Sequence, residues 1–142
     1  MKRLGFIEAP KQEATSVKTV YTTWTISVKW FPEDSIANRV VNKVLNEVGI
    51  DMVLTLIWEN WTFRLDRKSM MIGTNGYYDY WLCQLNYQYH KDFIDSKDFK
   101  DWEKQTEYCI WVWNDAVKKN KLSTTFYAYK TRNAHKDRII YN

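Results

Sequence analysis

The sequence predicts a small, mainly α-helical domain with a minor irregular or β lobe. Its 142 residues are enough for one domain with a hydrophobic core, and 45% of them are hydrophobic. Apolar residues recur at i, i+3, i+4 and i+7 in three segments, the spacing of one helix face. Between the second and third segments lies an irregular stretch with glycine and asparagine, which is typical of loops and turns.

The first thirty residues differ in composition from the rest of the chain. Residues 1–16 are polar and include Pro10, so we expect an arm outside the core. Residues 17–30 are rich in Val, Thr, Ile and aromatic side chains, which favours a strand. We therefore predict an N-terminal arm and strand-like extension over 1–30, followed by the domain over 31–142.

Two short antiparallel helices are expected next. Asp34 or Ser35 can cap the first helix, which Gly49 ends. Asp51 is the expected cap of the second, which ends at Glu59. The apolar residues that define the two helices are Ile36, Val40, Val41, Val44, Leu45, Val48, Met52, Val53, Leu54, Leu56 and Ile57.

The second half of the chain is predicted as a loop followed by helices. Residues 61–79 are irregular, with turns around Gly73 and Gly76, and a short helix is expected over 87–93. Asp101 can cap a longer helix with an inward face. That face comprises Trp102, Gln105, Tyr108, Cys109, Val112, Trp113 and Ala116.

The C-terminal residues are predicted to add one short helix and a tail. Ser123 or Thr124 can cap the helix, which runs through Tyr129. The tail from His135 onward is expected to be peripheral.

The charge of the chain is mildly basic, with a net charge of +4 and a pI of about 9.0. This favours approach to an anionic polymer, either an acidic cell wall or nucleic acid. The 21 basic residues are scattered along the chain, which argues against a nucleic-acid partner. No run reaches the roughly 20 apolar residues of a membrane span, and the basic N-terminus lacks the apolar core of a signal peptide. We expect a monomer.

The cysteines and histidines do not suggest a metal or nucleophile site. Cys83 and Cys109 stand outside any CxxC motif, so no metal is expected. They form a disulfide in an exported protein or remain two buried thiols. His90 and His135 have no clear Ser or Cys partner motif, and no glycine-rich phosphate loop is present. No cofactor is predicted.

Glu59 is the strongest candidate for chemistry. It closes an apolar helix, and desolvation raises the pKa of a buried carboxyl group, which stays protonated near neutral pH. A general acid needs that state to protonate a leaving oxygen. The structural alternative is a helix-capping or surface-paired glutamate.

Three segments in the same order resemble motifs of the lysozyme-like lytic transglycosylases. The family has a helix ending in Glu-Ser-Gly, a variable loop, a Gly-Leu-Met-Gln-Ile/Leu-Asn type segment and an Ala-Tyr-Asn segment. The corresponding runs here are Glu59-Asn60-Trp61, Leu82-Cys83-Gln84-Leu85-Asn86 and Phe126-Tyr127-Ala128-Tyr129. The resemblance covers about two thirds of the chain and implies an α+β lysozyme-like fold with a glycan cleft.

The resemblance also implies an activity on peptidoglycan glycan strands. Glu59 is the expected acid and base for cleavage of the MurNAc–GlcNAc β-1,4 bond, with a C6 hydroxyl or a water as the attacking group. Gln84 and Asn86 are expected to bind the glycan. Tyr129, or Tyr127 as the alternative, is expected to lie near Glu59, although Lys130 replaces the family's asparagine. Asp79 is a candidate to activate water. The expected place of action is outside the cytoplasm, in a cell wall, a periplasm or a phage-lysed host.

A non-catalytic glycan-binding or structural domain on the same fold is the alternative, because bulky Trp61 and Trp81 stand where the family has glycine. The chain has eight tryptophans and four glycines, an unusual ratio. One hypothesis is that some of these codons are UGA, read as glycine in the source. The candidates are Trp24, Trp61 and Trp81, with Trp102 and Trp111 as weaker ones.

Overall fold

The protein is described by a computed structural model that covers residues 25–96 and 98–142. This part of the chain is mainly helical, with two small two-stranded sheets, which agrees with the predicted class. The arm predicted for 1–16 and the start of the strand-like extension lie outside the described residues.

Helices α2 (Ile36–Glu47) and α3 (Ile50–Glu59) follow each other directly, as predicted. The Ser35 hydroxyl accepts the Asn38 N–H at 3.2 Å and caps α2. The prediction that Asp51 caps α3 is wrong, because Gly49 is the N-cap and Asp51 lies in the first turn. Gly49 has φ +139°, a conformation that glycine adopts readily, and it lets the chain pass directly from α2 into α3.

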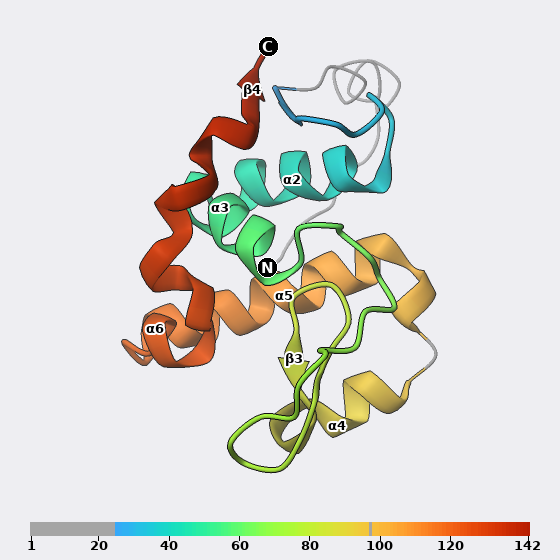
Figure 1. The fold of residues 1–142 in the computed structure, drawn as a ribbon, viewed down its shortest axis with the longest axis vertical. Coiled ribbons are helices and arrows are strands. Elements are labelled where there is room, and N and C mark those ends of the chain that lie inside the picture. Colours follow the sequence, from blue (N-terminus) through green and yellow to red (C-terminus); the bar gives the residue numbers. More distant parts are fainter. Residues whose placement is uncertain (1–24, 97) are drawn as a thin grey trace, which may run out of the picture.

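Helix α5 (Trp102–Lys118) crosses the molecule, with α2 and α3 on one side and α4 on the other (Figure 1). The Asp101 carboxylate accepts the N–H groups of Glu103 and Lys104, so the predicted cap is confirmed. The predicted inward face is also confirmed. Its buried members are Gln105, Cys109, Val112, Trp113 and Ala116.

The minor lobe is a short hairpin followed by helix α4. Strands β2 (Asp79–Tyr80) and β3 (Leu85–Asn86) are antiparallel, and Asp79 is paired with Asn86. Helix α4 (Tyr87–Asp95) ends two residues beyond the predicted range and is followed by a 3-10 turn, η1 (Asp98–Lys100).

The C-terminal segment departs from the predicted helix. Helix α6 (Leu122–Thr125) begins after Lys121, whose side chain makes no capping hydrogen bond. From Tyr127 onward the chain forms a 3-10 segment, η2 (Tyr127–Arg138), instead of continuing the predicted α-helix. Phe126 between them is extended and buried, with its ring 5.4 Å from that of Trp113. Burial of this ring against α5 therefore ends α6 before Tyr129.

The prediction of a peripheral tail is wrong. Strand β4 (Ile139–Tyr141) pairs antiparallel with β1 (Ile26–Val28), and Ile26, Val28 and Ile139 belong to the core. The strand predicted within 17–30 is confirmed at β1. The two strands lie more than a hundred residues apart in sequence, so local patterns gave no sign of the pairing.

Two buried asparagines of α2 hold β1 in place. The Asn42 side chain accepts the Ile26 N–H at 3.1 Å and donates to the Ile26 carbonyl at 2.9 Å. The Asn38 oxygen accepts the Val28 N–H at 2.8 Å. These bonds satisfy strand groups that are buried on the side away from β4. Residues 26–28 therefore pack with the same core as the rest of the domain.

Candidate functional site

Glu59 is the last residue of α3, where this helix packs along η2 (Figure 1). Its side chain is partly buried, and its carboxylate accepts the backbone N–H of Ala128. Burial is the largest effect on the Glu59 carboxyl group and raises its pKa to about 7. The negative charge of Asp79 also raises this pKa, whereas the hydrogen bond from the Ala128 N–H and the positive charge of Arg67 lower it. A carboxyl group with this pKa can both give and take a proton near neutral pH.

Arg67 connects the end of α3 with the turn that precedes β3. Its Nη1 donates to the Glu59 carbonyl oxygen at 2.9 Å. Its own carbonyl accepts the Trp81 N–H at 2.6 Å and the Gln84 Nε2 at 3.4 Å. Glu59 and Gln84 are therefore neighbours of the same residue. No sequence pattern points to Arg67, because it lies in the irregular loop.

The turn from Trp81 to Gln84 is fixed to two helices. Asn60 at the end of α3 donates its Nδ2 to the Leu82 carbonyl at 3.1 Å, and Gln105 of α5 accepts the Leu82 N–H at 2.8 Å. Both amide side chains are buried, at 1% and 0% exposure. Hydrogen bonds that replace water inside the protein hold this turn beside Glu59.

A disulfide adds a covalent connection to the same turn. Cys83 and Cys109 are bonded, with their Cα atoms 6.2 Å apart. The sequence left open whether these cysteines form a disulfide or remain two buried thiols, and the structure has the disulfide. The turn that carries Gln84 is thus joined to α5 directly.

The side chains of Gln84 and Asn86 both form hydrogen bonds within the protein. Gln84 has φ +54° and donates its Nε2 to the Trp81 carbonyl at 3.0 Å, while its Oε1 accepts no bond from the residues that the structure describes. The Asn86 oxygen caps α4 through the Gln88 N–H at 3.1 Å, and its Nδ2 donates to Asp79 Oδ1 at 3.0 Å. Asn86 therefore holds Asp79, whose charge acts on Glu59.

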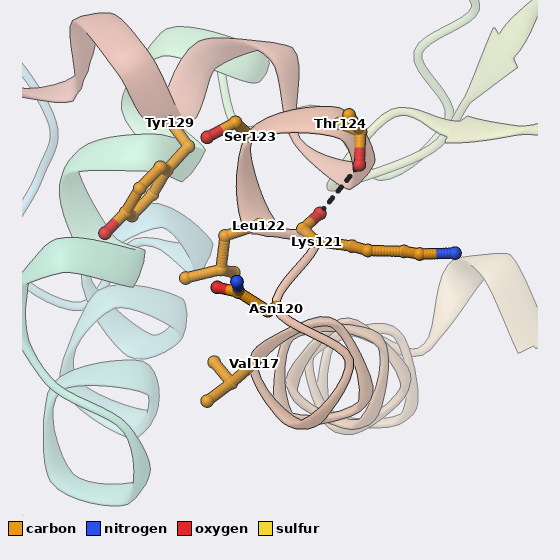
Figure 2. A pocket seen from close by; sticks show the side chains of 7 residues that line it. All are labelled: Val117, Asn120, Lys121, Leu122, Ser123, Thr124 and Tyr129. Atoms are coloured by element: carbon orange, nitrogen blue, oxygen red, sulfur yellow. Dashed lines mark hydrogen bonds between the residues drawn. The ribbon is translucent and has the colours of Figure 1, made fainter.

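Tyr129 lies one residue beyond the Ala128 N–H that binds Glu59. Its ring is 5.7 Å from that of Trp113, and the Arg132 guanidinium carbon lies 4.0 Å from its centroid. It also lines a pocket of about 240 Å³ between α5 and α6 (Figure 2). The other lining residues are Val117, Asn120, Lys121, Leu122, Ser123 and Thr124. Glu59, Asp79, Gln84 and Asn86 do not line this pocket.

Among the described residues, no group of three or more His, Cys, Asp or Glu side chains is arranged to hold a metal ion. His90 Nδ1 lies 2.8 Å from the Tyr108 hydroxyl, and burial lowers the pKa of His90. In residues 25–96 and 98–142, no helix is both long and apolar enough to cross a bilayer.

The raised pKa of Glu59 predicts a pH-dependent stability effect of the Glu59→Gln change. Between pH 4.5 and 7 the unfolded chain has lost the proton that the folded chain keeps, so the wild type becomes less stable as the pH rises. Glutamine has no proton to lose, so the variant does not lose stability in this way as the pH rises. We expect the variant to be more stable than wild type by up to about 3 kcal/mol at pH 8, with no gain at pH 4.

Urea unfolding at the two pH values measures this difference in the free energy of unfolding. Glu47→Gln is the matched control, because Glu47 is an exposed helix residue that pairs with Lys43. An equal gain for Glu59→Gln at pH 4 and pH 8 would contradict the assigned pKa.

Comparisons of the chain with protein-family models, with curated proteins and with solved structures find no significant match. The function is therefore inferred from the residues around Glu59 themselves.

Proposed function

We propose that this protein cleaves the glycan strands of peptidoglycan at the MurNAc–GlcNAc β-1,4 bond, with Glu59 as general acid and base. The observation that carries the proposal is the partly buried Glu59 carboxyl group at the end of α3, whose pKa desolvation raises to about 7. A carboxyl group that holds its proton at neutral pH suits protonation of a glycosidic oxygen. The order of the three motifs that resemble lytic transglycosylases supports the same activity.

The proposed reaction begins with proton transfer from Glu59 to the bridging oxygen. The bond from C1 to that oxygen breaks, and positive charge develops on the sugar ring. In the transglycosylase form, the C6 hydroxyl of the same sugar attacks C1 and gives its proton to Glu59, which leaves a 1,6-anhydro sugar. In the lysozyme form, water attacks instead, and Asp79 is the candidate to activate it.

The residues around Glu59 have supporting roles in this proposal. Gln84 offers its Oε1 to a sugar hydroxyl or amide, since its Nε2 is used within the turn. Asn86 orients Asp79 through the bond of 3.0 Å. The Ala128 N–H holds the Glu59 carboxylate, and Tyr129 supports that segment by packing on Trp113.

The place of action and the partners follow from the proposed substrate. Peptidoglycan lies outside the cytoplasm, so the protein would act in a cell wall, a periplasm or a lysed host. A net charge of +4 favours binding to the anionic wall. The proposal includes a monomer that needs no cofactor and no nucleic acid.

Clearing of purified peptidoglycan in a zymogram tests the proposal. We expect a clear band for the wild type, and mass spectrometry of the released fragments distinguishes anhydro from hydrated sugar ends. A folded protein that binds the wall without releasing fragments would instead identify a non-catalytic glycan-binding domain. A folded protein that neither binds nor cuts the wall would contradict both.

A further inference from the structure

We propose that positions 30 and 81 are glycine positions, and that the source organism makes this protein with glycine there, from UGA codons. Trp30 has φ +73° and Trp81 has φ +70°. In this left-handed region the Cβ atom of an L-residue crowds the following carbonyl, so bulky side chains are rare there. Glycine has no Cβ and adopts the region freely.

A positive φ by itself does not identify a glycine position, as Phe63 shows. Phe63 has φ +54°, but its ring is 4% exposed and packs edge-on against Phe31 at 5.7 Å, so burial offsets the strain. Trp30 is 81% exposed, and the Arg138 guanidinium carbon lies 5.2 Å from its ring. Little burial is gained there in return for the strained backbone.

Position 81 matters for the candidate site. Trp81 opens the turn to Gln84, its N–H binds the Arg67 carbonyl, and its own carbonyl accepts the Gln84 Nε2. The backbone makes these bonds, and a glycine keeps them. The indole packs edge-on to Tyr80 at 5.3 Å and its Nε1 donates to the Ile94 carbonyl at 3.4 Å, so glycine at this position gives up these contacts and relieves the positive φ.

The structure changes the set of recoding candidates that the sequence suggested. Trp30 joins it through its φ, and Trp81 is retained. Trp61 is not among the residues with positive φ, and Trp24 lies outside the described residues. Trp102 and Trp111 lie in the regular helix α5, where glycine is unfavourable.

The gene and the native protein test the proposal directly. UGA at codons 30 and 81, together with glycine in the peptide masses of protein from its source, is the expected result. UGG at either codon would overturn the proposal for that position.

Recombinant variants give a test that does not depend on the source or on any activity. We expect Trp30→Gly to raise the melting temperature by a few degrees, because it releases strain and loses little packing. Trp81→Gly is expected to melt at a higher temperature than Trp81→Ala, because both lose the indole contacts with Tyr80 and Ile94 and only glycine adopts the positive φ freely. Trp111→Gly is the matched control, since Trp111 is 58% exposed but helical, and it is expected to lower the melting temperature. A loss for Trp30→Gly as large as that of the control would overturn the glycine assignment at position 30, and a Trp81→Ala protein that melts as high as Trp81→Gly would overturn it at position 81.

Discussion

Replacing Glu59 by glutamine is expected to lower the rate of peptidoglycan cleavage by about 10²- to 10⁴-fold, the usual contribution of a general acid or base. Glutamine has nearly the same shape and can still accept the Ala128 N–H, but it has no proton to give to the glycosidic oxygen. The initial rate of turbidity loss of a purified wall suspension measures the effect.

Two controls separate a loss of chemistry from a loss of folding. Glu47→Gln makes the same chemical change at an exposed position on α2 and is expected to retain wild-type activity. Circular dichroism should show Glu59→Gln to be folded. Wild-type activity in a folded Glu59→Gln protein would remove Glu59 from the mechanism.

The pH profile of the wild type gives a second reading of the same proposal. A general acid must be protonated, so activity should fall as the pH rises through about 7, the pKa of Glu59. A rate that stays constant from pH 6 to pH 9 would show that another group supplies the proton.

The second large effect is expected from the disulfide. Converting both Cys83 and Cys109 to alanine should lower the free energy of unfolding by about 3 kcal/mol, because the bond closes a loop with a sequence separation of 26. The loop spans β3, α4 and the first turns of α5, so the unfolded chain gains much freedom when the bond is lost. Urea unfolding of the wild type and the double variant measures the difference.

Reduction provides the control for this prediction. A reducing agent should shift the unfolding midpoint of the wild type toward that of the double variant and leave the variant unchanged. Identical midpoints for the oxidised and reduced wild type would mean that the bond does not stabilise the fold.

The helical part of the fold could be predicted from sequence because its signals are local. The Ser35 and Asp101 caps and the apolar spacing of α2, α3 and α5 each depend on residues a few positions apart. The start of α3 was misplaced because a glycine cap competes with a nearby aspartate, and the φ of Gly49 decides between them. The prediction of a helix through Tyr129 is wrong, because burial of Phe126 against Trp113 outweighs the local preference of these residues for a helix.

The sequence by itself determined the main helices and the candidate acid, since a carboxyl group that ends an apolar helix is desolvated wherever that helix packs. Only the tertiary structure decided what surrounds it: the Ala128 N–H, the charge of Asp79 and the position of Arg67. It also decided the pairing of β1 with β4 and the bond between Cys83 and Cys109. These contacts join residues far apart in the chain, and their geometry arises only when the helices pack together.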